Sequence, residues 1–394
     1  MPSSAKIAPA RARFWADPQV RAWLFQLLAV LAVVALGWFL FDNTQTNLAK
    51  RGITSGFAFL NNSAGFGIAQ HLIDYQESNS YGRVFFVGLL NTLLVSLIGI
   101  VLATALGFAI GVARLSPNWL LNKLASVYIE IFRNIPPLLQ IFFWYFAVML
   151  ALPGPRQSLQ LSEGLFLNNR GLYLPALSAD GGWAAGLGAL LLALIGAVLL
   201  RRWARARFEA SGKTFPLWPC VVALVLGLPA LASVIFGAPL SVSVPQLTGF
   251  NFRGGWVLIP ELLALLLALS IYTAAFIAEI VRSGIKSVNH GQTEAARSLG
   301  LAAGKTLSLV IIPQALRVII PPLTSQYLNL VKNSSLAAGI GYPDMVSLFA
   351  GTVLNQTGQA IEVIAITMSV YLAISISISM LMNAYNKRIA LIER

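Results

Sequence analysis

The chain has very few of the residues from which catalytic and metal-binding sites are usually built. Its 394 residues include one cysteine, Cys220, and two histidines, His71 and His290. One cysteine cannot form an intrachain disulfide, and these three residues do not have a metal-ligand spacing. Two such distant histidines also give no Ser/His/Asp grouping. We therefore expect no catalytic residue, no metal site and no covalent reaction carried out by this chain alone.

Charge is scarce as well. Only 10% of the residues are charged, whereas soluble domains carry about 25%. The hydrophobic share is 57% and the mean hydropathy is +0.75. These values predict an all-α polytopic membrane protein, because a helix satisfies its own backbone polar groups within lipid. The formal net charge of +13 is attributed to membrane topology, and no aromatic-rich basic domain indicates a nucleic-acid partner.

The hydrophobic runs predict about eight transmembrane helices. The third run contains Pro136-Pro137 and should be broken there, because proline cannot donate the helical hydrogen bond. The seventh begins at Pro321-Pro322 and is so polar that it should lie inside the protein or line a cavity. The eight predicted spans are approximately 22–41, 84–113, 124–152, 183–200, 217–239, 257–281, 318–340 and 361–384.

The distribution of basic residues predicts that both termini are cytoplasmic. With eight spans and the N-terminus inside, the opposite side holds only Lys50, Arg51, Arg156, Arg170 and Arg253. The positive-inside rule favours the side with more Lys and Arg for the cytoplasm. The cytoplasmic residues are then Lys6, Arg11, Arg13, Arg21, Arg114, Lys123, Arg201, Arg202, Arg205, Arg207, Lys213, Arg282, Lys286, Arg297, Lys305, Arg317, Lys387, Arg388 and Arg394.

The chain divides into four parts. Residues 1–82 hold the cytoplasmic N-terminus, the first span and an external loop, and residues 83–152 begin a polar-rich core. Residues 153–256 hold an external loop, predicted to be irregular over 153–182, and a peripheral, lipid-facing hairpin. Residues 257–394 complete the core and include a cytoplasmic loop at about 284–317.

Two smaller patterns each allow two interpretations. Gly107-Phe-Ala-Ile-Gly111 has the spacing of small residues that allows close helix packing, although such patterns also arise by chance in glycine-rich spans. The basic stretch Arg201–Arg207 is best explained as a loop that sets topology, with binding to an ATPase or to acidic lipid as the alternative.

A polar island, His290–Gly300, lies between apolar spans. Thr293 is predicted to cap a short helix, and Gly300 to end it in a left-handed conformation. A second short helix is expected over about 302–311, ending near Pro313. Small residues at the tip of such a protrusion suit docking into another protein's groove. The alternative is an ordinary amphipathic surface loop.

The stretch Gly300-Leu-Ala-Ala-Gly304-Lys305-Thr306 resembles a phosphate-binding loop only superficially. A P-loop has four residues between its glycines and follows a β-strand. Here there are three residues and no strand is expected. This stretch is therefore not expected to bind a nucleotide.

Several polar residues fall within or beside the spans, where they are costly and usually functional. Glu279 is three residues before Arg282, so an intrahelical ion pair and a substrate contact are both open. The candidate pathway residues are Asn134, Gln140, Tyr272, Glu279, Gln326 and Asn329.

Four blocks in one order resemble a known family. They are Phe132–Gln140, Tyr272–Gly284, Glu294-Ala-Ala…Gly300 with Ile311-Ile-Pro313, and Lys332-Asn-Ser-Ser-Leu336. The third resembles the cytoplasmic EAA loop of ABC-importer permeases, and the set resembles the polar amino acid uptake branch. The inserted hairpin and long outer loops are similar to the Q-type permease of general L-amino-acid importers. Asn134 and Pro137 depart from the residues common in that branch.

The resemblance implies a type I ABC-importer permease fold in a bacterial inner membrane, surrounded by lipid. It also implies a second, similar permease, a cytoplasmic ATPase dimer, a periplasmic amino-acid-binding protein and an L-amino acid substrate, in a broad range. The ATPase, and not this chain, would then bind ATP and Mg²⁺. An amino acid carries an ammonium and a carboxylate, which suits a polar cavity with groups of both signs. The ATPase-coupling residues that it implies are Gln292, Glu294, Ala295, Ala296, Arg297 and Gly300. Of these, Ala295 and Ala296 would form the buried face of the docking helix.

Two other functions compete with this interpretation. An ion-gradient-driven amino acid transporter would need internal repeats with paired broken helices, and the sequence has no such repeat. A membrane-embedded sensor or enzyme would be expected to carry a soluble signalling or catalytic domain, and the sequence shows none. The permease therefore remains the favoured interpretation.

Overall fold

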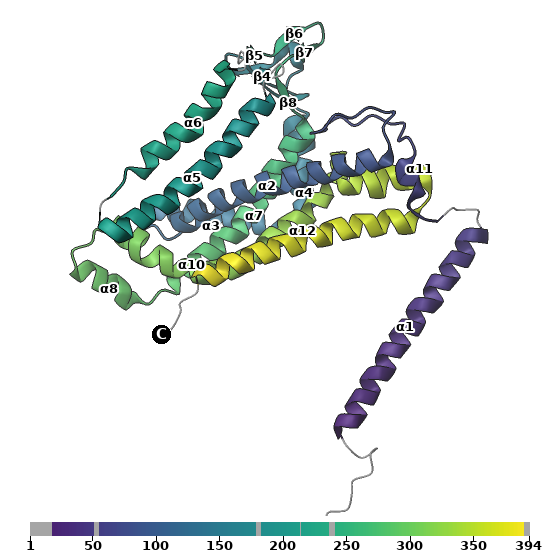
Figure 1. The fold of residues 1–394 in the computed structure, drawn as a ribbon, viewed down its shortest axis with the longest axis horizontal. Coiled ribbons are helices and arrows are strands. Elements are labelled where there is room, and N and C mark those ends of the chain that lie inside the picture. Colours follow the sequence, from purple (N-terminus) through teal and green to yellow (C-terminus); the bar gives the residue numbers. More distant parts are fainter. Residues whose placement is uncertain (1–17, 51–54, 179–182, 213, 236–240, 390–394) are drawn as a thin grey trace, which may run out of the picture.

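The computed structural model describes residues 18–50, 55–178, 183–212, 214–235 and 241–389. Six of the residues assigned above to one side of the membrane lie outside these ranges: Lys6, Arg11, Arg13, Arg51, Lys213 and Arg394. The long helices are α1 (Pro18–Lys50), α2 (Tyr81–Ala113), α5 (Trp183–Ser211), α6 (Leu217–Ile235), α7 (Pro260–Lys286), α10 (Ile312–Asn333) and α12 (Ala360–Ile389). Figure 1 shows α1 apart from a bundle formed by α2, α7, α10 and α12.

Five helical segments are long and apolar enough to cross a membrane: Pro18–Thr44, Tyr81–Ala113, Pro260–Lys286, Ala303–Ile340 and Ala360–Arg388. They correspond to the first, second, sixth, seventh and eighth predicted spans. Pro137–Met149 and Leu217–Ala232 are shorter apolar helices at the third and fifth positions. The all-α membrane class is confirmed, while the count of eight stays a prediction.

The central helix α7 is packed most closely against α2. A Cβ atom at Gly107 would lie 2.6 Å from atoms of Ile277, and one at Gly111 would lie 2.7 Å from the Ala278 carbonyl oxygen. Real Cβ atoms do not approach so closely, so these two positions require glycine. The pair of small residues therefore packs two helices of the same chain, as the first of its two interpretations predicts.

The third predicted span is broken where its prolines fall. Helix α3 (Trp119–Asn134), capped by Asn118, ends before Ile135-Pro136, and α4 (Pro137–Phe142) begins with proline in its first turn. A π-helix, η3 (Phe143–Met149), follows directly. The break predicted from sequence is confirmed.

The seventh predicted span begins earlier than Pro321, because α10 contains both Pro321 and Pro322 in its interior. It continues into the 3₁₀-helix η6 (Ser334–Ile340), and Gly341 then turns the chain with a φ of 76°. The π-helix η7 (Val346–Val353) and α11 (Leu354–Thr357) lead to α12. On the N-terminal side of the core, the 3₁₀-helix η2 (Phe57–Asn61) precedes α2.

The external loop was predicted to be irregular over 153–182, but its described part, residues 153–178, forms strands. After the short 3₁₀-helix η4 (Pro155–Gln157), strands β1 (Leu159–Ser162), β2 (Leu165–Asn168) and β3 (Gly171–Leu174) form an antiparallel meander, and β8 (Trp256–Leu258) pairs with β3. Two further antiparallel pairs complete this part: β4 (Ala176–Ser178) with β5 (Ser241–Ser243), which lies beyond α5 and α6 in the chain, and the hairpin of β6 (Gln246–Thr248) with β7 (Asn251–Arg253). The sheet escaped prediction because β8 is about eighty residues further along the chain than its partner.

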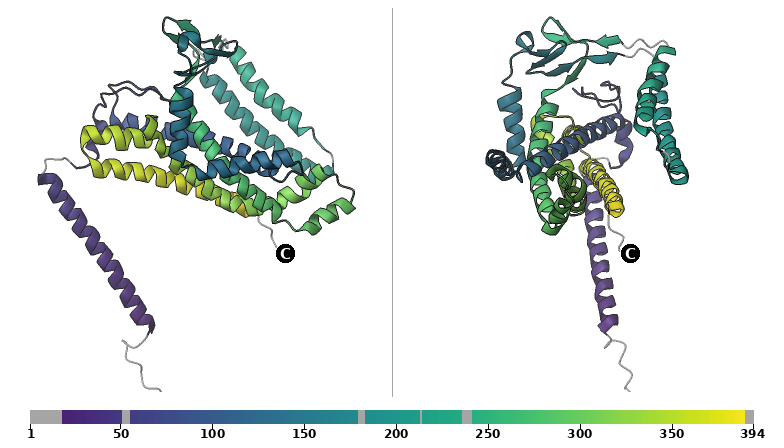
Figure 2. Two further views of the ribbon diagram at one scale, coloured as in Figure 1. Left: turned by 180° about the vertical axis from the view of Figure 1, so that it is seen from behind. Right: turned by 90° about the vertical axis from the view of Figure 1, so that its left-hand side faces the viewer.

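The hairpin α5–α6 is peripheral, as predicted. Its two helices pack on each other, and Figure 2 shows them beside the bundle, at the edge of the molecule. The apolar side chains of α5 and α6 are largely exposed, among them Leu191, Leu192, Leu226 and Leu231. A surface of this kind suits contact with lipid.

Candidate functional site

The polar island forms a short helix that projects beyond the bundle. Helix α8 (His290–Ser298) follows α7 after a turn of three residues, and Figure 1 shows it at one extreme of the molecule. The Asn289 side chain caps it by accepting a hydrogen bond from the backbone N–H of Gly291 at 2.9 Å. The prediction that Thr293 is the cap was wrong, because the helix begins one turn earlier than the alanines suggested.

The end of α8 is closed by the predicted glycine. Gly300 has a φ of 78°, its N–H donates to the Arg297 carbonyl at 2.8 Å, and the Leu301 N–H donates to the Ala296 carbonyl at 3.1 Å. This pair of bonds satisfies carbonyls that a helix end would leave free. The helix therefore has defined ends although it is only nine residues long.

One face of α8 is covered by the chain itself and the other is open. Ala296 is 4% exposed, whereas Leu299 is 82% exposed. Gln292, Glu294, Ala295, Arg297 and Gly300 are also exposed. Ala295 and Ala296 were predicted to share a buried face. The structure corrects this, because consecutive residues point about 100° apart on a helix.

The second short helix does not end near Pro313, contrary to prediction. Helix α9 (Ala303–Thr306) leads into the π-helix η5 (Leu307–Ile311), which joins α10 directly. Pro313 lies in the first turn of α10, where its missing N–H is tolerated. The side chains of Gln314 and Gln292 meet at 3.2 Å, so α10 also holds α8.

A cavity of about 1010 Å³ lies behind α8. Its walls come from the turn between α2 and α3, the end of α7, α8 itself and α9 with η5. Ser116, Thr293 and Arg297 are among its polar lining residues. The inner side of α8 therefore borders open space that extends to the α2–α3 turn.

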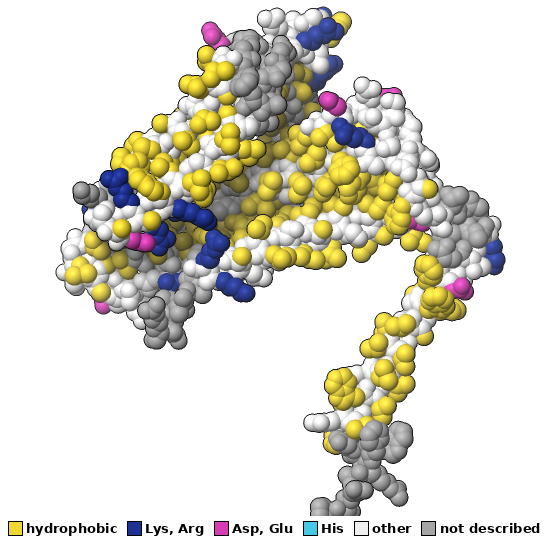
Figure 3. Space-filling view, viewed as in Figure 1, with side chains coloured by type: hydrophobic (Ala, Val, Ile, Leu, Met, Phe, Trp, Pro, Cys, Tyr) yellow, Lys and Arg dark blue, Asp and Glu magenta, His cyan; other side chains and the backbone are white. Residues whose placement is uncertain are grey.

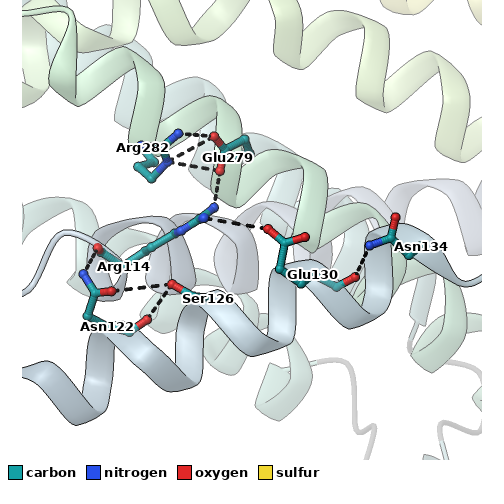
Figure 4. A network of polar contacts seen from close by, with 7 residues as sticks. All are labelled: Arg114, Asn122, Ser126, Glu130, Asn134, Glu279 and Arg282. Atoms are coloured by element: carbon teal, nitrogen blue, oxygen red, sulfur yellow. Dashed lines mark hydrogen bonds and ion pairs between the residues drawn. The ribbon is translucent and has the colours of Figure 1, made fainter.

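Close to this cavity, a charge network joins three helices (Figure 4). Glu279 on α7 is paired with Arg114 at the end of α2 and with Arg282 one turn further on. Arg114 also lies 3.9 Å from the Glu130 carboxylate on α3. The Asn122 side chain donates to the Arg114 carbonyl and so holds α3 to the same point.

This network decides between the two interpretations of Glu279. Its carboxylate is 24% exposed and both of its oxygens contact arginine. A carboxylate shared by two guanidinium groups is satisfied without a substrate. The ion-pair interpretation is therefore the one that the structure supports.

The other predicted pathway residues do not converge on one point. Gln140 is buried, and its amide donates at 3.0 Å to the carbonyls of Phe132 and Ile135, which the break in the helix leaves without helical partners. Asn134 is exposed and donates to the Glu130 carbonyl, and Tyr272 packs on the Phe276 ring at 5.0 Å. These contacts give Gln140 a structural role at the break.

Gln326 and Asn329 lie on α10 at the spacing of one helix face. One turn further on, Lys332 and Ser335 line a cavity of about 390 Å³ with Thr367 and Tyr371 of α12. The side chains of Gln326, Asn329 and Lys332 therefore follow one side of α10 at helical spacing.

A buried polar cluster was missed at the sequence level. Asp344 is 1% exposed, accepts hydrogen bonds from the Tyr371 hydroxyl at 3.0 Å and the Ser347 N–H at 2.8 Å, and follows a turn held by Asn91 of α2. The available signal was one acidic residue, in Gly341-Tyr-Pro-Asp344, within an otherwise apolar stretch. Its partners lie on distant helices, so the sequence alone does not bring them together.

Known proteins with similar sequences identify the family of this chain. The family model described as binding-protein-dependent transport system inner membrane component matches residues 96–391. A putative amino-acid ABC transporter permease, YhdX of Escherichia coli, is 66% identical over 96% of this chain and 97% of its own length. The general L-amino acid transport system permease AapQ of Rhizobium johnstonii is 50% identical over 96% of this chain and 94% of its own length.

A third relative is BztB of Rhodobacter capsulatus, described as a glutamate/glutamine/aspartate/asparagine transport system permease. It is 42% identical over 96% of both chains. All three alignments include the external sheet and the hairpin as well as the core. The chain therefore belongs to the family of binding-protein-dependent transport system inner membrane components.

Proposed function

We propose that the chain is one permease subunit of an ABC importer that moves L-amino acids from the periplasm to the cytoplasm. It is a transporter subunit rather than an enzyme. The names of its relatives support an amino acid as the substrate. A second, similar permease completes the pathway, a periplasmic binding protein delivers the amino acid, and a cytoplasmic ATPase dimer holds ATP and Mg²⁺.

The observation that carries this proposal is the geometry of α8, which we call the coupling helix. Its outer face exposes Glu294, Ala295, Arg297 and Leu299, so a partner can reach it. Its inner side is fixed by Ala296 and by the contact of Gln292 with Gln314. A helix that is open on one side and held on the other can pass a displacement from an ATPase to α7 and α10.

The charge network extends this path. Glu279 lies two turns before the end of α7 and forms an ion pair with Arg114 at the end of α2. Because Asn122 of α3 is hydrogen-bonded to Arg114, the end of α2 and the first turns of α3 are both connected to the helix that leads into α8. A movement of the coupling helix is then shared by three helices. Alternating access by rocking of helix bundles needs such a rigid connection.

The proposed orientation puts α8 and both termini in the cytoplasm. On the face shown in Figure 3, Lys and Arg side chains gather around the end of the molecule that carries α8. Anionic headgroups and the positive-inside rule favour this end for the cytoplasmic side. The substrate then passes along the polar surface of α10 at Gln326 and Asn329.

The test is a crosslink from Ala295→Cys in a Cys220→Ala background, with purification of the complex from native membrane. We expect an ATPase subunit to be crosslinked at position 295 and a second permease to co-purify. Ser162→Cys, on the external strand β1, is the matched control and should capture no ATPase. Recovery of an uncrosslinked chain that still drives uptake would contradict the proposal and favour an ion-gradient-driven transporter.

A further inference from the structure

The basic stretch 201–207 is helical, although the sequence suggested a loop. Helix α5 continues through it without a break and ends at Ser211. From Trp183 to Arg201 the helix rises about 27 Å, which is close to the thickness of the hydrocarbon core, about 30 Å. A helix that enters the hydrocarbon core at Trp183 therefore reaches the headgroups of the other leaflet at Arg201.

A groove of about 390 Å³ lies between α5 and α6 at this end of the hairpin. Among the described residues that line it, Arg201 alone is charged, and the others are apolar, such as Leu194 and Val198 of α5 and Leu217 of α6. Leu194 lies two turns before Arg201, which places it about 10 Å deeper in the membrane. The groove therefore has a charged end near the headgroups and an apolar end within the hydrocarbon core.

The charge of Arg201 is not neutralised by the chain. Arg205 pairs with Glu209 at 3.0 Å, and the Arg207 guanidinium lies 5.2 Å from the centroid of a tryptophan ring on the same helix. Arg201 is exposed and forms no ion pair within the part of the chain that the structure describes. A guanidinium group binds phosphate oxygens well, because its N–H groups donate two parallel hydrogen bonds.

Tryptophan side chains lie at the same level. Trp218, in the first turn of α6, lines the groove and is 76% exposed. Trp203 of α5 is 48% exposed, and its ring meets that of Phe215 edge-on, with the centroids 5.3 Å apart. Tryptophan is enriched where headgroups meet hydrocarbon. These residues indicate that the open end of the groove lies at the membrane–water interface.

The groove is on the side of the molecule that carries the coupling helix. Figures 1 and 2 show the end of α5 and the start of α6 near α8, away from the external strands. The proposed orientation places this end at the cytoplasmic leaflet, which carries anionic lipids. Basic pockets between spanning helices on this side are typical sites for anionic headgroups.

The depth of the groove favours lipid over a soluble ATPase, the other partner considered for the basic stretch. Leu194 and Val198 lie below Arg201 within the hydrocarbon core, which a soluble protein does not reach. A phospholipid has both required parts, a phosphate and an acyl chain that runs away from it. Residues 201–211 contain four arginines and one glutamate, so a headgroup with net negative charge is favoured over a zwitterionic one.

We propose that an anionic phospholipid of the cytoplasmic leaflet binds between α5 and α6, with its phosphate on Arg201 and an acyl chain in the groove. The bound lipid fixes the turn end of the inserted hairpin at the membrane surface. The inference goes beyond the transport function, and only the choice of leaflet depends on the proposed orientation. Its readout, lipid bound to the protein, requires neither substrate nor ATP.

The experiment measures lipid binding by native mass spectrometry. The purified transporter, delipidated in detergent, is titrated with phosphatidylglycerol or with phosphatidylcholine that has the same acyl chains. Arg201→Gln removes the proposed phosphate contact, and Arg207→Gln is the matched control, because it removes the same charge from the same helix outside the groove. Ala197→Trp fills the groove, and Ile195→Trp, which is exposed and lies outside the groove, is its control.

We expect the unmodified transporter to bind phosphatidylglycerol more tightly than phosphatidylcholine. Arg201→Gln should weaken phosphatidylglycerol binding roughly tenfold, as for a lost charge-assisted hydrogen bond, whereas Arg207→Gln should change it less than about threefold. Ala197→Trp should weaken the binding of both lipids, and Ile195→Trp should not. Inorganic phosphate should not displace the lipid, because it leaves the groove empty.

Three results would overturn the proposal. Equal losses in Arg201→Gln and Arg207→Gln would show a diffuse basic surface instead of a site. Unchanged binding in Ala197→Trp would show that no acyl chain occupies the groove. Displacement of phosphatidylglycerol by inorganic phosphate would show that the headgroup contact alone holds the lipid.

Discussion

Helices α7 and α8 are separated by three residues, yet they are opposite in character. Most of α7 is buried, and both α2 and α10 pack on it so closely that glycine is required at the contact. Helix α8 buries only Ala296 and exposes nearly every other side chain. This difference fits the proposed function. A helix that passes on a movement is best packed rigidly, as α7 is, whereas a helix that docks a partner needs an open surface, as α8 has.

The largest effect on stability is expected from a substitution at the contact between α2 and α7. Gly111→Leu should prevent the close approach of α2, because a Cβ there already falls 2.7 Å from the Ala278 oxygen and 2.8 Å from Val281. Overpacking typically costs about 1–3 kcal/mol, and a backbone contact cannot yield as a side chain can. We expect a large fall in the unfolding temperature of the purified complex.

The control for this change is Gly227→Leu in α6, where a Cβ would meet no atom within 4 Å. Leucine is a better helix former than glycine, so this variant should be neutral or slightly stabilising. Equal losses for both variants would show that the α2–α7 contact is not special.

The next effect concerns the charge network. Glu279→Gln removes the carboxylate that Arg114 and Arg282 share. Breaking a fully buried pair costs about 3–5 kcal/mol, and partial exposure should reduce this to about 1–2 kcal/mol. The unfolding temperature of the complex measures the loss. Glu209→Gln, which breaks an exposed pair with Arg205, should change it by no more than the ~0.5 kcal/mol typical of surface pairs.

A smaller and local effect is expected at the start of α8. Asn289→Ala should cost about 1 kcal/mol of helix stability, because the Gly291 N–H loses its acceptor. Hydrogen exchange of the α8 amides should become faster while α7 stays protected. Thr293→Ala tests the cap first expected from the sequence, and exchange in α8 should not change. Faster exchange in Thr293→Ala alone would reverse the assignment.

The substitution with the smallest expected effect on stability should have the largest effect on transport. Ala295→Arg adds a long side chain to the open face of α8 and should leave the unfolding temperature unchanged, since Ala295 is exposed. Amino acid uptake in membrane vesicles should be lost, because the partner's groove no longer closes. If uptake persisted in Ala295→Arg, α8 would not be the docking surface. Lys305→Ala, on the neighbouring exposed helix α9, is the control and should keep uptake.

Local chemistry explains which predictions succeeded. Proline at 136 and 137 removes backbone donors, so the third span breaks there whatever surrounds it. Glycine at 300 permits a left-handed residue, so α8 ends there. The start of α8 was misplaced because Asn289 and Thr293 are both acceptable caps, and the choice depends on how α7 ends.

The roles of the candidate site residues were harder to predict than the helix ends, because these roles depend on tertiary contacts. Gln140 is a polar residue within a predicted span, which suggested a pathway residue. In the structure its side-chain amide donates hydrogen bonds to carbonyls at the break between α3 and α4. Glu279 gained a second arginine from α2, which is 165 residues away in the chain. A polar residue within a span predicts a role, but only its neighbours decide whether that role is structural.

By itself, the sequence determined the membrane class, most of the spans, the broken helix and the polar island, because hydropathy, proline and glycine act over a few residues. Tertiary structure alone decided the external sheet, the contact of α2 with α7, the charge network and which face of α8 stays open. These features join segments far apart in the chain. Their stability comes from burial and pairing that no single segment contains.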